Sequence, residues 1–242
     1  MAEKIKKYAS LKDIPPREYM YFPKGQLEMG RPGKFSRLEV LQLVLAVIVL
    51  TVAFAFPLSK TSVLNYFLYD SFNFESIILF LPLSLLGICT AFFVHELSHK
   101  FMAQRFGLWS EFRMFPKGLV FSLLLAMFSG FVFAAPGAVI FRGEARHFEM
   151  GRIAAAGSLA NIIIAVITYP LYIYVFFETV DIARIIGFIC LVNALLATFN
   201  LLPFRPLDGA EVIRWNGIVW GCMFSLAFVV TVLIVPRVML FL

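Results

Sequence analysis

The sequence predicts an all-α polytopic membrane protein with five or six transmembrane helices. Of its 242 residues, 61% are hydrophobic and only 15% are charged, an apolar share well above that of ordinary soluble domains. The apolar residues gather in at least five separate runs, each about 20 residues long, which is enough to cross a hydrocarbon core of roughly 30 Å as a helix. Because lipid cannot satisfy open backbone groups, we expect these runs to be helical.

The chain begins with a basic tail, residues 1–37, that we expect to lie on the cytoplasmic face. The tail mixes lysine and arginine with proline and glycine, a composition that favours extended structure. The first apolar run begins only near Leu38, so we expect no cleavable secretory signal. Residues 38–242 are then expected to form a single transmembrane domain. The net charge of +6 suits the positive-inside rule better than nucleic-acid binding.

Five apolar stretches are the expected transmembrane helices: residues 39–58, 76–107, 151–178, 182–203 and 215–235. A further run, at about 118–141, is also long enough to span. Ser129, Gly130, Pro136 and Gly137 interrupt this run, and it is rich in aromatic residues. It could either cross the bilayer or enter and return.

Charged loops favour the second alternative for the 118–141 run. If it crossed, the basic loops near residues 142–152 and 205–214 would lie outside and the acidic loop at 178–181 inside, which reverses the usual bias. If it folds back as a re-entrant hairpin or a small membrane-associated sheet, the basic loops return to the cytoplasm, with Arg184 as an exception. We therefore expect a re-entrant segment.

Within the second apolar run, His95, Glu96 and His99 form the sequence HELSH, an HExxH signature. This spacing puts both imidazoles on one face of a helix and lets Glu96 reach a water at a bound metal. On a solvated helix the same pattern also arises by chance. Inside lipid each ionisable residue carries an insertion cost of about 3 kcal/mol, so three together indicate a shared partner such as a metal ion.

A catalytic zinc takes three protein ligands and keeps a fourth position for water, so a third ligand is required. Asp208 is the best candidate among the acidic residues near the later apolar runs. Pro203 and Pro206 break the helix before it, and Gly209 lets the backbone turn, so the carboxylate can point back inward. On local grounds the same features are equally typical of an ordinary turn residue.

The depth of the two motifs favours a role for Asp208 as a ligand. From the outer edge near Ile77, His95 lies about 18 residues along its helix, or roughly 27 Å at 1.5 Å per residue, close to the cytoplasmic boundary. With a re-entrant 118–141 segment, the helix at 182–203 runs inward and delivers Asp208 to that same boundary. An additional crossing would place it on the opposite side.

These motifs resemble those of the site-2 protease family of intramembrane metalloproteases. HELSH fits the family's HExxH, and NLLPFRPLDG at residues 200–209 fits its Asn-x-x-Pro followed by Leu-Asp-Gly. The similarity includes AAAGSLANIII at residues 154–164 and so covers about residues 76–214. Ser158 and Ser98 replace a proline and a glycine that are common in the family, while all ligand and base positions are filled.

The resemblance implies that Asn200 binds the substrate backbone or stabilises the oxyanion. The alternative role for Asn200 is a hydrogen bond between two helices. Asn161 is interpreted as structural, because Gly157 and Ser158 beside it permit close helix approach. His147 lies in a basic segment without a partner at ligand spacing and is interpreted as a solvated loop residue.

The sequence thus predicts a zinc metalloendopeptidase that cleaves transmembrane protein substrates within or near the bilayer, in regulated intramembrane proteolysis. One zinc ion per chain would be held by His95, His99 and Asp208, with Glu96 as general base. The expected partners are membrane substrates and the lipid bilayer, not nucleic acid. The expected location is the cell membrane, with a cytoplasmic N-terminus.

Two other functions would use the same sequence features. A membrane metal transporter or sensor could employ the same ligand set, but it would not require Glu96 as a base. A scaffold that binds membrane helices through aromatic and small residues would leave HELSH without metal.

Overall fold

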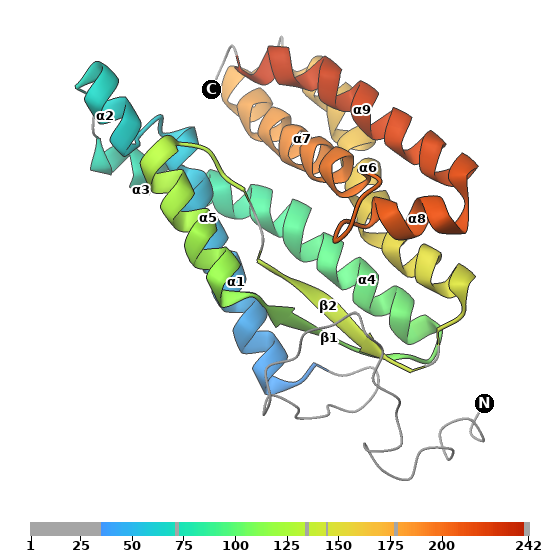
Figure 1. Ribbon diagram of the computed structural model, residues 1–242. Coiled ribbons are helices and arrows are strands. Elements are labelled where there is room, and N and C mark those ends of the chain that lie inside the picture. Colours follow the sequence, from blue (N-terminus) through green and yellow to red (C-terminus); the bar gives the residue numbers. More distant parts are fainter. Residues whose placement is uncertain (1–34, 71–72, 134–135, 144, 177–178, 240–242) are drawn as a thin grey trace.

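The computed structural model describes residues 35–70, 73–133, 136–143, 145–176 and 179–239 (Figure 1). Its elements are α1 (Arg37–Leu58), α2 (Val63–Tyr69), α3 (Phe74–Ile88), the π-helical turn η3 (Cys89–Phe93), α4 (Val94–Arg105), β1 (Trp109–Met114), α5 (Pro116–Ser129), β2 (Gly137–Arg142), α6 (His147–Phe176), α7 (Val180–Asn200), α8 (Gly209–Trp215) and α9 (Gly217–Met239). Of the predicted tail, positions 1–34 lie outside the described residues. Ser36 then caps α1 by accepting a hydrogen bond from the Glu39 N–H.

Five helical stretches in the described part of the chain are long and apolar enough to cross a membrane. They are Arg37–Tyr69, Phe74–Arg105, His147–Val175, Val180–Asn200 and Gly217–Val238. Only 22% to 50% of each apolar window is buried inside the protein, so the rest of each window faces outward. The prediction of an all-α, multi-pass membrane protein is confirmed.

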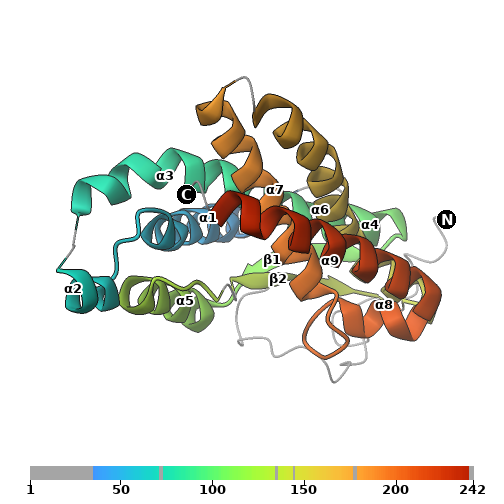
Figure 2. The same ribbon diagram turned by 90° about the horizontal axis from the view of Figure 1, so that it is seen from above.

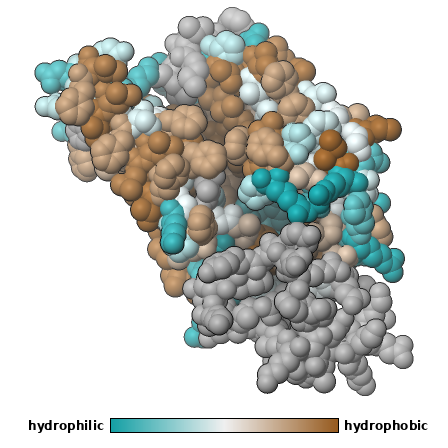
Figure 3. Space-filling model, viewed as in Figure 1, coloured by the Kyte–Doolittle hydropathy of each residue, from teal (hydrophilic) through white to brown (hydrophobic). Residues whose placement is uncertain are grey.

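Apolar side chains cover the outside of the helices. Figure 3 shows hydrophobic residues gathered over the left-hand and upper parts of the face in view. Phe67, Leu79 and Ile218 are each more than three-quarters exposed, at 79%, 77% and 80%. An apolar surface this extensive is unfavourable in water and suits contact with lipid tails.

The segment predicted to re-enter at 118–141 leaves and returns at the same end of the molecule. Helix α5 runs beside α1 (Figure 1), and β2 then pairs antiparallel with β1, with Met114 opposite Gly137. Pro116 lies in the first turn of α5, where a missing N–H is tolerated, and Gly130 ends the helix in the left-handed conformation. The 14 residues of α5 span about 21 Å, short of a core of roughly 30 Å. The small sheet, one of the two expected alternatives, is present as β1 and β2, and re-entry of this segment into the bilayer stays a prediction.

Helix α4 lies between two groups of elements (Figures 1 and 2). On one side α1, η3, α5 and the hairpin share an apolar core that includes Leu50, Phe92, Phe112 and Val139. On the other side α6, α7 and α9 pack together, and α8 joins the same group through Val212. A side chain on α4 can therefore meet partners from both groups.

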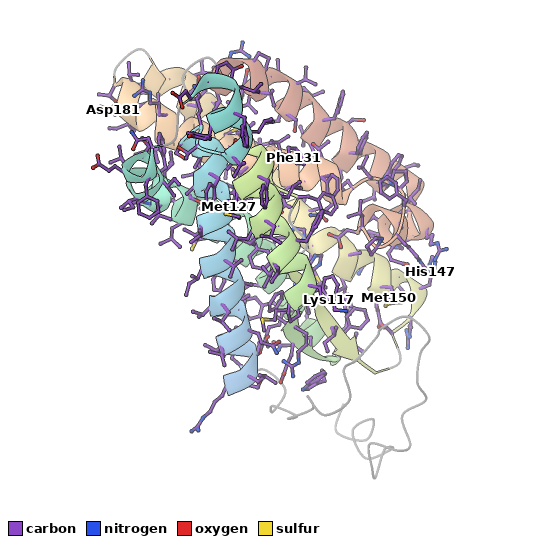
Figure 4. All side chains as sticks on the ribbon, turned by 60° about the vertical axis from the view of Figure 1, so that its left-hand side comes forward. Lys117, Met127, Phe131, His147, Met150 and Asp181 are labelled. Carbon is purple, nitrogen blue, oxygen red and sulfur yellow. The ribbon has the colours of Figure 1, made fainter. Side chains whose placement is uncertain are left out.

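Charged residues lie at both ends of the molecule, and Asp181 forms an ion pair with Arg184 at its end. Figure 4 shows Asp181, in the first turn of α7, at one end of the molecule and Lys117 and His147 towards the other. His147 is exposed, as expected, but it is the first residue of α6 and not a loop residue. Helix α7 ends at Asn200, three residues before the predicted end at 203.

Candidate metal centre

The three predicted ligands come together at one point beside α4. The Nε2 atoms of His95 and His99 are 2.9 Å apart, and the Asp208 Oδ2 atom lies 3.4 Å from the first and 3.2 Å from the second. Both histidines are buried, and Asp208 is partly buried. The i and i+4 spacing on one helix thus meets a carboxylate that is more than a hundred residues away in the chain.

Asp208 reaches the histidines because α7 ends early and the chain folds back to start α8. The Trp220 indole N–H donates to the Leu201 carbonyl at 2.7 Å, satisfying one of the free carbonyls at the end of α7. A side chain at Gly209 would lie 2.2 Å from that same carbonyl oxygen, so only glycine fits this close return. Asp208 occupies the N-cap position of α8, yet its side chain makes no capping bond. It accepts instead from the Ser158 hydroxyl at 3.2 Å.

The Asp208 carboxyl lies outside the membrane-spanning helices, and its pKa is shifted. Burial on its own raises this pKa. The positive charge of protonated His99 and the hydrogen bonds from both imidazoles outweigh burial and hold the pKa below its ordinary range. The carboxylate is therefore ionised at neutral pH, the form that binds a metal cation.

A second layer of hydrogen bonds orients the two imidazoles. The His99 Nδ1 atom lies 2.7 Å from the Ile153 carbonyl oxygen, which can only accept. The His95 Nδ1 atom lies 2.6 Å from Asn161 Oδ1. The Asn161 amide nitrogen donates to the Ala91 carbonyl and to Asn193 Oδ1, which identifies its other atom as the acceptor oxygen. Both Nδ1 atoms are therefore donors, and both Nε2 atoms face Asp208, where each can donate a proton to the carboxylate or offer a lone pair to a metal ion.

This arrangement fits a divalent metal ion. Two imidazole lone pairs and a carboxylate oxygen converge, and such acceptors repel one another unless a proton or a cation lies between them. Ligands about 2.0–2.1 Å from a tetrahedral zinc stand roughly 3.3 Å apart. The measured separations of 2.9, 3.4 and 3.2 Å are close to that value. Nitrogen and carboxylate ligands are also the types that zinc accepts.

The π-helical turn η3 lies directly before the HELSH segment and contributes to its placement. A π turn widens the helix by one residue and is frequent at functional sites. It leaves the Ala91 carbonyl to accept from the Asn161 amide at 3.0 Å. Asn193 extends the same network by donating to the Thr90 hydroxyl at 3.3 Å. The distorted turn is thus bonded to α6 and α7, the helices that flank the metal centre.

Glu96 is buried next to His95, but its carboxylate is held by a different element. Its Oε2 atom accepts a hydrogen bond from the Val139 N–H of β2 at 3.1 Å. It does not belong to the ligand group formed by His95, His99 and Asp208. The hairpin therefore fixes one of the two oxygens of this carboxylate, and the role of Glu96 as general base stays a prediction.

Comparison with known proteins identifies the family. The chain is 34% identical over 190 residues to the "Putative zinc metalloprotease MJ0611" of Methanocaldococcus jannaschii, a match that covers 78% of this chain and 90% of that protein. The chain belongs to the family of site-2 protease-like zinc metalloproteases. No family model matches the sequence, and no solved structure does.

In this metalloprotease a glycine makes room for the ligands. A Cβ atom added at Gly157 on α6 would lie 2.4 Å from His99 Nε2 and 2.8 Å from His95 Cε1. Helix α6 can therefore pass across both imidazoles only where it has no side chain. Ser158, the next residue, supplies the hydroxyl bonded to Asp208.

Asn200, the remaining predicted site residue of the metalloprotease, is the last residue of α7. Across the described residues it forms no hydrogen bond with the three ligands or with Glu96, and its role stays a prediction.

Three polar residues at the metal centre were not assigned to it from sequence. Asn161 was interpreted as structural, and it does bond between helices, but it also orients His95. Ser158 and Asn193 were given no part in the site. The available signal was their position as polar residues within apolar helices, where each polar group needs a partner.

Proposed function

We infer that this metalloprotease is an intramembrane endopeptidase of the site-2 type, which hydrolyses peptide bonds within or near the transmembrane segments of other membrane proteins. The observation that carries this proposal is the convergence of His95, His99 and Asp208 beside Glu96, on helices whose outer surface is apolar. A hydrolytic centre on such helices suits a substrate that is itself in the membrane.

In this proposal His95, His99 and Asp208 hold one zinc ion per chain, with the bonds from Asn161 and the Ile153 carbonyl keeping both Nε2 atoms directed at it. When bound, zinc supplies Lewis-acid polarisation of the scissile carbonyl and of the attacking water. Glu96 takes the proton from that water and passes it to the leaving amine. Asn200 is a candidate for contact with the substrate backbone or the oxyanion, as the family resemblance implies.

The substrate backbone must be extended at the cleaved bond, so a helical substrate has to unwind locally. We propose that the re-entrant hairpin receives the unwound segment as an added strand. The Val139 N–H points away from β1 towards Glu96, which supports this proposal, because the outer edge of β2 then runs past the general base.

The proposed location is the cell membrane, with the N-terminus and the metal centre near the cytoplasmic face. The support is charge: Lys117 lies towards the hairpin end, as does His147, which follows Arg146 and precedes Arg152 in the sequence, and Asp181 lies at the other end, with Arg184 as the exception. Water would reach the centre from that nearby surface.

A cleavage assay in lipid vesicles tests the proposal. Wild type and Glu96→Gln would each be reconstituted with a single-span model substrate, and product masses would locate the cut bond. We expect wild type to cut within or next to the span, whereas Glu96→Gln retains zinc and does not cut. If zinc binds and no cleavage depends on Glu96, the metal transporter or sensor is favoured instead.

A further inference from the structure

Lys100 and Glu39 form an ion pair that is almost completely buried, one helical turn beyond Glu96. The Lys100 Nζ atom lies 2.7 Å and 2.6 Å from the two Glu39 carboxylate oxygens, and the residues are only 1% and 0% exposed. Taking two charges out of water is costly, and an apolar pair of similar volume is often at least as stable. Stability alone is therefore a weak reason for this pair.

Both members of the pair also bond to β1. Lys100 Nζ donates to the Ser110 carbonyl at 3.1 Å, and Ser110 Oγ donates back to the Lys100 carbonyl at 3.1 Å. Glu39 Oε1 accepts from the Phe112 N–H at 3.0 Å. The pair thus joins α1, α4 and the outer edge of the hairpin.

The strand register connects this pair to the proposed general base. Phe112 stands opposite Val139 in the antiparallel sheet, and each directs its N–H away from the other strand. The Phe112 N–H binds Glu39, and the Val139 N–H binds Glu96. Val139 thus bonds to α4 directly. Phe112 is connected to α4 through Glu39 of α1, whose partner Lys100 lies four residues after Glu96.

We propose that Lys100 and Glu39 are positioning residues that hold the hairpin so that the Val139 N–H fixes one Glu96 oxygen and leaves the other free for the attacking water. This inference rests on the proposed function, because it assigns a purpose to the pair only if Glu96 is the general base. Neither residue touches the metal ligands with its side chain in the contacts of the described residues, so the pair acts on the base and not on metal binding.

Two double variants separate positioning from folding. Glu39→Leu with Lys100→Met removes both charges and the acceptor for the Phe112 N–H while keeping much of the volume. Glu39→Gln with Lys100→Met also removes both charges but retains a carbonyl oxygen for that N–H. Ser84→Ala is the matched control, because the Ser84 hydroxyl donates to the Thr51 carbonyl at 2.6 Å and joins α3 to α1 without bonding to the hairpin.

Zinc content, thermal midpoint, kcat and KM would be measured for each variant against wild type and Glu96→Gln. The Leu/Met variant is expected to bind zinc fully, keep its KM and lose kcat by about 10- to 100-fold, the range typical of residues that orient a reactive group. The Gln/Met variant is expected to lose less kcat, because the Phe112 N–H keeps an acceptor. Ser84→Ala should keep the wild-type kcat.

A Leu/Met variant that binds zinc and cleaves at the wild-type kcat would overturn the inference while leaving the proposed function intact. Loss of zinc or of folded protein in that variant would show a structural role and also overturn it. A rise in KM at unchanged kcat would show that the hairpin holds substrate without positioning Glu96. Wild type that binds zinc but does not cleave would instead defeat the proposed function, and this inference with it.

Discussion

Gly157 is the residue at which the fit between helix α6 and the metal centre is closest. Gly157→Ala should reduce the zinc bound per chain, because the new methyl group would overlap both imidazoles, with His99 Nε2 only 2.4 Å away. Metal analysis of the purified variant would measure this loss. Gly221→Ala on α9 is the control, since nothing lies within 4 Å of an added Cβ there. Full zinc binding by Gly157→Ala would show that the centre is looser than described.

Asn161 acts through His95. Replacing it by alanine removes the acceptor that holds the His95 Nδ1 proton, so zinc affinity should fall about 10- to 100-fold. Competition with a chelator of known affinity would measure the change. Thr168→Ala, on the same helix, removes a hydroxyl that donates to backbone carbonyls of α6 and contacts Cys190 of α7, and it should leave the affinity unchanged. Equal affinities in both variants would argue against an orienting role.

At the residue scale, sequence reasoning could predict the meeting of His95, His99 and Asp208 but not the partners of these residues. HExxH spacing is a local property of one helix, and the proline and glycine residues around Asp208 mark a turn at the matching depth. The Asn161 and Ser158 contacts depend on how α6 crosses α4. That crossing is set by packing between helices, which the sequence pattern of a single helix does not encode.

The re-entrant hairpin is the element that most affects the topology of the chain. Cysteines introduced at Lys117 and His147 should react with a membrane-impermeant maleimide from one side of sealed vesicles, and a cysteine at Asp181 should react from the other side. All three positions are exposed, and Cys222, an exposed native cysteine, would first be replaced by serine. Labelling of Lys117→Cys and His147→Cys from opposite sides would mean that α5 crosses the bilayer.

Three local elements could not be predicted from sequence. The 118–141 run indicated a re-entrant segment, but β1 lies before it, in the polar stretch WSEFRM, and forms because α1 side chains accept from its outer N–H groups. Helix α2 is only seven residues long, too short to produce a clear periodic pattern. The π turn η3 differs from an α-helix by one residue and leaves no mark in composition.

At the scale of the whole molecule, the metal centre joins parts that are distant in sequence. The histidines come from α4, Asp208 from the junction of α7 and α8, and the hydrogen bond to Glu96 from β2.

Zinc that binds only the folded chain should therefore stabilise it, by about 2.7 kcal/mol at a free concentration 100 times the Kd. Thermal unfolding with and without zinc would show a higher midpoint for wild type, and Asp208→Ala should show a smaller shift or none. A zinc-independent midpoint in wild type would contradict a structural link between the metal and the fold.

The measurement that tests the central claim most directly is cleavage of a transmembrane substrate after zinc is removed and then restored. Wild type stripped with a chelator should lose cleavage and regain it when one zinc ion per chain is returned, whereas Glu96→Gln should take up the same zinc and remain inactive. Cleavage that persists in fully zinc-free wild type, or returns with zinc in Glu96→Gln, would contradict the account.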